Sequence, residues 1–212
     1  KFSSNISVVE KFIDHYICMG NAREKVGGCL DKAIATCHQH RFHAVEVLRS
    51  NMNQLEDLLQ RMPDLFVLYY VRDPRAIAAS TLKVNLQSAE KNVYEESWMV
   101  CSKMNQDLED FRQLSKRYPG AFILAKYEDF ITNPAKFGKS VYKYLGLKDS
   151  APEWRIMMSN ALNSTKNDGA FGTMRKNGKE NIDKWRVGMK ENEIQEINRA
   201  CKSVLEALDY AI

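Results

Sequence analysis

The chain has 212 residues, of which 44% are hydrophobic and 27% are charged, and its formal net charge at pH 7 is +4. This length and composition suit one domain with its own core. The mild positive charge allows an anionic ligand, but no dense lysine and arginine stripe indicates nucleic-acid binding. No apolar run is long enough to span a membrane. The first residues, KFSSNISVVEKF, lack the apolar segment of a signal peptide.

The cysteines do not decide the cellular compartment by themselves. There are five: Cys18, Cys29, Cys37, Cys101 and Cys201. None forms a CxxC pair, and the nearest metal-like cluster is the stretch CHQHRFH over 37–43. A helix end leading into a strand explains that stretch better than zinc does, so we expect no metal. Sequons at Asn5 and Asn163 permit glycosylation if the chain is lumenal.

Local patterns in the first half predict helices and strands in alternation. We expect helices over 6–19 and 23–37, a strand over 42–48, a helix over 52–61, a strand over 65–71 and a helix from Pro74. The segment FHAVEVL at 42–48 alternates as a strand does. Residues 65–71 form a nearly continuous apolar run, which is typical of a strand buried on both faces. Asn51 is a good helix cap, and proline is favoured in a first helical turn.

The second half continues the pattern. We expect the longest helix over 89–117, a strand over 121–126, helices over 135–145 and about 152–162, a polar loop over 163–180, and a helix over about 191–208. The long helix carries one face of mostly apolar residues, namely Cys101, Met104, Leu108, Phe111 and Ser115. Strands separated by helices indicate a parallel sheet covered on both faces. Ligands bind at the carboxyl ends of such strands, where 42–48, Arg72 and 126–129 should meet.

The stretch LYYVRDPRAIAAS at 68–80 is the most specific local signal. Arg72 ends a buried strand, and a helix begins within two residues. Free amides and the positive dipole end of that helix, beside an arginine fork, suit a phosphate or sulfate dianion. Ser80 lies about two turns into the helix and can add a hydroxyl. The alternative is structural: Asp73 caps the helix, and Arg72 pairs with a carboxylate.

This stretch resembles the 3′-phosphate-binding motif of sulfotransferases that use PAPS (3′-phosphoadenosine 5′-phosphosulfate), in which an Arg at a strand end is followed eight residues later by a Ser. The sequence RDPRA most resembles the motif of the Golgi carbohydrate sulfotransferases. Further segments resemble the same family in order and spacing: KYEDF at 126–130 with NP at 133–134, VYKYLGL at 141–147, and a tail with KWR at 184–186, Glu193-Ile194, Cys201 and LDY at 208–210.

A late basic loop strengthens the resemblance. Sulfotransferases fold such a loop over the 3′-phosphate, and FGTMRKNG at 171–178 resembles it. The resemblance implies cofactor binding by Arg175, Lys176, Gly178 and Thr173, in addition to Arg72 and Ser80. The structural alternative is a solvated basic loop. Further cations near an anion held by Arg72 would offset its charge.

The resemblance implies an α/β, P-loop-like three-layer fold with a central parallel sheet flanked by helices, in a single domain over 1–212. It implies transfer of a sulfuryl group from PAPS to a carbohydrate hydroxyl without a metal, in the Golgi lumen. The family also has a strand–loop–helix that holds the 5′-phosphosulfate. We find no such segment in the sequence, and expect this chain to be the C-terminal part of the domain, with an N-terminal membrane anchor outside it.

The catalytic base is less well marked. Glu46 is the first choice and His43 the second, and an alternating strand would point them to opposite faces. A salt bridge of Glu46 with Arg49 or Arg72 is an equal alternative. For the carbohydrate acceptor we expect contacts from Arg49 and from Trp98 on the long helix, although such aromatics are often simply part of the core.

Two points stay open at this level. A lumenal location favours disulfides: Cys29 and Cys37 are one candidate pair, while Cys101 and Cys201 lie on core-facing helix sides as a disulfide or as buried thiols. The absent 5′-phosphosulfate loop also leaves a non-catalytic relative that binds a nucleotide or a sulfated glycan. A nucleotide kinase fits less well, because no magnesium-binding Ser/Thr and carboxylate are found.

Overall fold

The computed structural model describes residues 31, 34, 35, 38, 39, 42–47, 50–84, 92–147, 162 and 178–211. The chain divides into two units, Lys1–Arg49 and Ser50–Ile212, which are described separately. In the first unit, residues 31, 34 and 35 are helical, as the prediction over 23–37 requires, and residue 38 is helical as well. The predicted helix over 6–19 lies outside the described residues. The helix predicted over about 152–162 does too, apart from Leu162, which is helical.

The predicted strand over 42–48 is wrong for the residues described there. Residues 42–47 belong to neither a helix nor a strand. Their alternating apolar side chains are exposed, with Val45 at 83% and Val47 at 62%. Alternation alone does not make a strand, which also needs a neighbouring strand to complete the ladder of hydrogen bonds.

The second unit contains the parallel sheet and the helices around it. Its described elements are η1 (Met52–Gln54), α3 (Leu55–Arg61), β1 (Val67–Val71), α4 (Pro74–Val84), α5 (Val93–Arg117), β2 (Phe122–Lys126), α6 (Tyr127–Thr132), α7 (Pro134–Tyr144), α9 (Glu180–Val187) and α10 (Glu191–Ala207). Two of these elements, α6 and α9, were not predicted. None of the described helices is long and apolar enough to cross a membrane.

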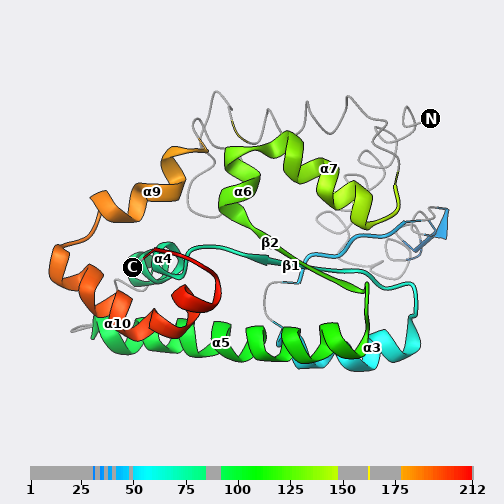
Figure 1. The fold of residues 1–212 in the computed structure, drawn as a ribbon, viewed down its shortest axis with the longest axis horizontal. Helices are drawn as coiled ribbons and strands as arrows, with labels where there is room; N and C mark the ends of the chain where they lie inside the picture. The colour runs from blue at the N-terminus through cyan, green and yellow to red at the C-terminus, as the bar shows by residue number, and fades with distance from the viewer. Residues whose placement is uncertain are drawn as a thin grey trace, which may run out of the picture. The chain divides into compact units, whose positions relative to one another are not determined.

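The two described strands lie side by side and parallel, with Val67 opposite Phe122 and Val71 opposite Lys126. Helix α5 runs along one face of this pair, and α6 and α7 lie on the other (Figure 1). The structure thus confirms an α/β arrangement with a parallel sheet. The full three-layer, P-loop-like fold stays a prediction.

The two faces of β1 are covered unequally, so the prediction of a strand buried on both faces is wrong. Tyr69 packs against Phe111 of α5, with 5.6 Å between ring centroids. On the other face, Tyr70 meets Phe137 of α7 at 6.2 Å. Even so, Leu68 and Tyr70 are 43% and 46% exposed. Aromatic edges from α6 and α7 cover this face only in part.

The core lies between α4, α5 and α10. Ile197, Cys201, Val204 and Leu205 of α10 are all 0% exposed, and they pack with Cys101 and Leu108 of α5. The apolar face predicted for the long helix α5 and the core-facing position predicted for Cys201 are therefore confirmed. Cys101 and Cys201 form a disulfide, which decides between the two states that the sequence left open.

Short polar signals set the helix ends. Asn92 accepts hydrogen bonds from the amides of Tyr94 and Glu95, so α5 begins four residues later than predicted. Asn133 accepts in the same way from Lys136 at the start of α7. Helix α4 begins at Pro74, as predicted.

Candidate functional site

Arg72 lies where β1 ends and α4 has not yet begun. Its Nη2 donates a hydrogen bond of 2.6 Å to the backbone oxygen of Asn181, in the first turn of α9. Its guanidinium carbon lies 4.5 Å from the centroid of the Tyr127 ring at the start of α6. Its Nε–H is buried and has no hydrogen-bond partner among the described residues. Part of the fork is therefore unsatisfied among the described residues.

Asp73 and Arg75 form a closed pair beside it. The Asp73 carboxylate accepts from the Arg75 amide at 2.9 Å and from Arg75 Nη2 at 2.8 Å. Asp73 is 6% exposed and Arg75 is 3% exposed. Arg75 also donates to the backbone oxygen of Ala211 and lies 4.7 Å from the ring centroid of Trp185. The structural alternative thus holds for Asp73, which caps α4 and pairs with Arg75, but Arg72 forms no ion pair with a described carboxylate.

The expectation of free helix amides at this edge is wrong. The Asp73 amide donates to Glu128 Oε1 at 3.0 Å, and the Arg75 amide is taken by Asp73. The Ala76 amide donates to the backbone oxygen of Asp73. Because the first-turn donors are already used, an anion here depends on the Arg72 side chain rather than on the α4 amides.

The C-terminal tail, residues 208–211, joins the two strand ends. Lys126 donates to the backbone oxygen of Leu208, and its Nζ lies 4.7 Å from the ring centroid of Tyr210. The Tyr210 hydroxyl donates to Glu128 Oε2 at 2.7 Å. Burial, followed by the Glu128 hydrogen bond and charge, raises the pKa of Tyr210 well above 10.0. The sequence indicated an LDY tail but not that its tyrosine meets Glu128.

Glu128 is therefore a bridge between segments that are distant in sequence. One oxygen holds the Asp73 amide, next to Arg72, and the other holds Tyr210. Glu128 contacts the backbone beside Arg72, so its effect on Arg72 is indirect.

Ser80 is exposed on α4. Ala76 lies four residues before it, on the same helix face, and packs with Ala79 against Trp185 of α9. Arg72 reaches the first turn of α9 as well. Both predicted phosphate ligands thus lie toward α9, and their convergence on one anion stays a prediction. Ala76, Ala78 and Ala79 are buried, as expected for a helix that sits close to its neighbours.

Of the predicted basic loop, only Gly178 is described; Thr173, Arg175 and Lys176 lie outside the described residues. Gly178 donates its amide to the backbone oxygen of Leu162 at 3.0 Å. A Cβ added to it would lie 3.0 Å from Leu162 Cδ2 and 3.2 Å from Ile131 Cδ1. Close packing explains a glycine there. Gly178 lies three residues before Asn181, whose carbonyl Arg72 contacts. Its role in cofactor binding stays a prediction.

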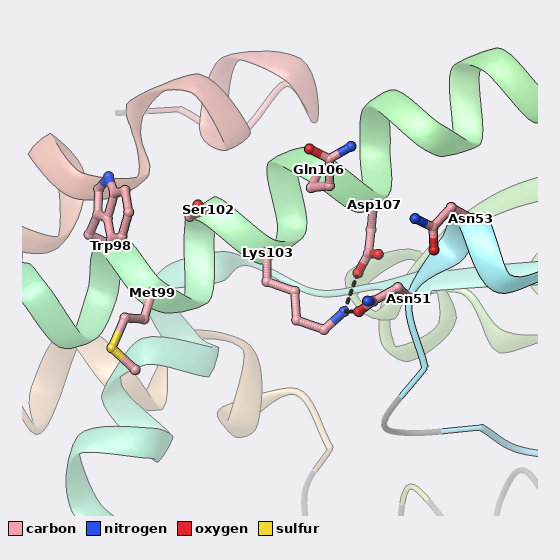
Figure 2. Close-up of a pocket in the computed structure, with 8 residues that line it drawn as sticks. All are labelled: Asn51, Asn53, Trp98, Met99, Ser102, Lys103, Gln106 and Asp107. Atoms are coloured by element: carbon pink, nitrogen blue, oxygen red, sulfur yellow. Dashed lines mark hydrogen bonds and ion pairs between the residues drawn. The ribbon is translucent and has the colours of Figure 1, made fainter.

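Trp98 is not part of the core, because it is 52% exposed. It lines an open groove of about 430 Å³ along α5 and η1, shown in Figure 2. The groove is lined by Asn51, Asn53, Trp98, Met99, Ser102, Lys103, Gln106 and Asp107. Lys103 is fixed there by Asn51 Oδ1 at 2.8 Å and Asp107 Oδ2 at 2.9 Å. An exposed indole among amides and a hydroxyl suits a sugar ring.

The predicted base candidates lie in the other unit. His43 and Glu46 belong to Lys1–Arg49, whereas Arg72 belongs to Ser50–Ile212. Arg49 lies outside the described residues. The roles of these three residues therefore stay predictions. Within the part of the chain that the structure describes, no three His, Cys, Asp or Glu side chains gather as metal ligands.

Comparison with known proteins adds independent findings. A family model described as "Sulfotransferase family" matches residues 10–151. Carbohydrate sulfotransferase 1 of Danio rerio is 26% identical over 223 residues, which cover 90% of this chain and 51% of that protein. Carbohydrate sulfotransferase 3 of Homo sapiens is 24% identical over 228 residues, and the match covers 96% of this chain and 46% of that protein. The chain spans about half the length of these relatives. No solved structure matches.

Proposed function

The chain belongs to the sulfotransferase family, and from this premise we propose that it transfers a sulfuryl group from PAPS to a hydroxyl group of a carbohydrate. The curated relatives carry the name carbohydrate sulfotransferase, which supports a sugar acceptor. The proposal includes the full three-layer, P-loop-like fold. It also includes the Golgi lumen, whose oxidising chemistry suits the Cys101–Cys201 disulfide.

The observation that carries the proposal is the contrast among the charged groups at the strand ends. Asp73 is neutralised by Arg75, and Glu128 is held by Tyr210 and the Asp73 amide. Arg72 has no ion-pair partner among the described residues, and its buried Nε–H has no acceptor there. A buried unpaired donor is costly, and a phosphate oxygen would satisfy it.

In this proposal Arg72 and Ser80 hold the 3′-phosphate of the donor. Arg175 and Lys176 add positive charge from the basic loop, with Gly178 and Thr173 beside them. Arg75 neutralises Asp73, whereas the partners of Glu128 are neutral, so Arg72 and the basic loop have to offset the Glu128 charge as well as that of the phosphate. The Arg72 guanidinium is prepared for planar recognition by its contact with Tyr127.

For the acceptor, we propose a catalytic base and residues that contact the sugar. Glu46, or His43 as the second choice, takes the proton of the attacking hydroxyl as the sulfur–oxygen bond forms. As that bond forms, the bond between sulfur and the 5′-phosphate oxygen of PAPS breaks, and negative charge builds on the leaving PAP. Arg49 and Trp98 contact the sugar, and the exposed Trp98 indole offers a flat apolar face for it.

The first test is binding of PAP (3′-phosphoadenosine 5′-phosphate), the product left by the donor, to the full-length protein. We expect Arg72→Ala to weaken PAP binding, measured by calorimetry, by about tenfold or more, because charge-assisted hydrogen bonds contribute about 1.5–3 kcal/mol. Arg61→Ala is the matched control, since Arg61 pairs only with exposed Asp57 on α3. It should leave PAP affinity unchanged.

Equal PAP affinity in wild type and Arg72→Ala would refute the assignment of the donor site. Binding of PAP without sulfate transfer from radiolabelled PAPS to any carbohydrate acceptor would support the non-catalytic alternative. Transfer that is lost in Glu46→Gln but kept in His43→Gln would identify the base.

A further inference from the structure

A row of lysines on α7 is not used by the function proposed above. Lys136, Lys139 and Lys143 follow one another at three- and four-residue steps and are exposed. Such steps place them on one side of the helix, over about 10 Å at 1.5 Å per residue. With Asn133, Ala135 and Ser140 they line an open groove of about 450 Å³. We call Lys136, Lys139 and Lys143 the lysine stripe.

The opposite side of α7 faces the sheet, which fixes where the stripe points. Phe137 meets Tyr70 of β1, and Tyr144 meets Phe66, with ring centroids 6.2 and 5.4 Å apart. The Tyr144 hydroxyl donates to the backbone oxygen of Ala121, just before β2 begins. The exposed lysines therefore lie on a side of α7 that is turned away from the sheet, which α7 covers on one face (Figure 1).

The direction of α7 links the stripe to the candidate site. Helix α6 starts directly at the carboxyl end of β2, and α7 follows it after Asn133. The far end of α7, at Tyr144, lies by the amino ends of both strands. The lysine stripe thus runs from the carboxyl ends of the strands, where Arg72 lies, toward their amino ends, as α7 itself does in Figure 1.

The stripe is not neutralised by its surroundings. Helix α7, PAKFGKSVYKY, contains no acidic residue. None of the three lysines forms an ion pair with a described carboxylate. Elsewhere in the described chain, Lys103 pairs with Asp107 and Lys202 lies 3.9 Å from Glu206. Three parallel, unpaired cations along one groove form a linear electrostatic feature.

We propose that the lysine stripe binds an acidic polysaccharide, a chain that carries sulfate or carboxylate groups at regular intervals. The proposal rests on the proposed function, in which a growing sulfated glycan is the product. A polymer that gains negative charge at the Arg72 edge would then be held along α7 while another sugar is presented. The linear spacing of the lysines suits a repeating anion better than a single small ligand.

A membrane surface is the competing partner, and the composition of α7 argues against it. Helices that lie in a lipid interface need large apolar side chains beside their cations. The exposed residues of α7 are Ala135, Lys136, Lys139, Ser140 and Lys143, while Phe137 and Tyr144 pack toward the sheet. The stripe offers charge without an apolar anchor, which suits a hydrated polyanion.

The test measures binding of a fluorescent heparin oligosaccharide to the full-length protein, in parallel with its desulfated form and with neutral dextran. We expect the triple variant Lys136→Gln/Lys139→Gln/Lys143→Gln to bind the heparin oligosaccharide at least about tenfold more weakly. The slope of log affinity against log salt should fall by about two to three, about one for each lysine. The thermal midpoint should not change, because the three side chains are exposed.

The matched control is Lys116→Gln/Lys190→Gln/Lys202→Gln, which removes the same charge from α5, the start of α10 and α10 itself. It should retain heparin affinity within about twofold, if local rather than net charge governs binding. Equal losses in both triple variants would overturn the proposal, as would unchanged binding in the stripe variant or equal binding of neutral dextran. Stripe-dependent binding to phosphatidylserine vesicles without heparin binding would assign the stripe to a membrane and also overturn it.

PAP calorimetry on the same proteins separates this proposal from the proposed function. The stripe variant should keep wild-type PAP affinity. If the wild-type protein fails to bind PAP but binds heparin through the stripe, the donor assignment fails and the stripe stands. If PAP binds and heparin binding ignores the stripe, the reverse holds.

Discussion

The two strand-to-helix turns at the carboxyl edge of the sheet have similar positions and different tasks. The turn after β1 contains Arg72, whose Nε–H remains without a described partner, next to the closed pair of Asp73 and Arg75. Where β2 passes directly into α6, Lys126 and Glu128 both make internal contacts, with the C-terminal tail and the Asp73 amide. One turn presents a cation, and the other holds that turn in place.

This difference shows that the interaction partners of a charged side chain indicate whether it stabilises the fold or can bind a ligand. Arg72 and Arg75 are three residues apart and look equivalent in RDPR. Arg75 has a carboxylate, a carbonyl and an indole as partners. Arg72 has a carbonyl and a phenol ring, which leave its charge uncompensated. We therefore expect Arg75 to govern stability and Arg72 to govern ligand binding.

The largest effect on stability should come from Arg75→Ala. It leaves the Asp73 carboxylate, only 6% exposed, without its ion-pair partner. Breaking a buried pair in this way costs about 3–5 kcal/mol. The free energy of unfolding, measured by urea denaturation, should fall by that amount.

Two variants control this prediction. Arg61→Ala breaks a pair whose side chains are 73% and 65% exposed, so the loss should stay below about 1 kcal/mol. Arg72→Ala should cost about 1.5–3 kcal/mol, less than Arg75→Ala, because it removes the hydrogen bond to Asn181 and the contact with Tyr127 but leaves no buried carboxylate without its cation. A larger loss in Arg72→Ala than in Arg75→Ala would reverse the roles given to the two arginines.

A smaller effect is expected from Glu128→Ala, which tests whether the second turn supports the first. It removes the acceptor of the Asp73 amide and of Tyr210, and an unsatisfied buried donor costs about 1–3 kcal/mol. PAP affinity should fall too, since the affected amide adjoins Arg72. Glu128→Gln keeps an oxygen for that amide and should recover part of both losses. A Glu128→Ala protein with wild-type PAP affinity would show that the turns act independently.

Much of this edge was predictable because its signals are local. The apolar runs at 65–71 and 121–126 and the proline at Pro74 predicted β1, β2 and the start of α4, and Asn51 marked the helix before them. Cys101 and Cys201 fell on the core-facing sides of α5 and α10, where the disulfide forms. Each signal depends on backbone conformation or helical period, which short stretches of sequence encode.

What failed depends on distant partners. Helix α6 begins directly after β2 with no side-chain cap, and α9 buries little besides Trp185, so neither has a strong local pattern. The segment 42–47 alternates but is neither strand nor helix in the structure. The link from Tyr210 to Glu128 joins residues 82 positions apart. Such contacts follow from the packing of α10, which propensity alone does not specify.

The smallest effect should come from Tyr210→Phe, which removes one hydroxyl and leaves the ring beside Lys126. Losing the hydrogen bond to Glu128 should cost about 1 kcal/mol near neutral pH.

The Tyr210→Phe variant should also change how stability depends on pH. Burial, together with the negative charges of Glu128, Asp73 and Asp129, raises the pKa of Tyr210 above its ordinary 10.0 in the folded state. The folded protein therefore holds the phenolic proton more tightly than the unfolded chain, and this stabilisation is complete below pH 10 and lost as the pH rises further. Above pH 10 the unfolding free energy of the wild type should fall more steeply than that of Tyr210→Phe, and Tyr69 and Tyr70 contribute equally to both proteins. Parallel pH curves would mean that the Tyr210 hydroxyl is not held by Glu128, and that the C-terminal tail does not brace the Arg72 edge through it.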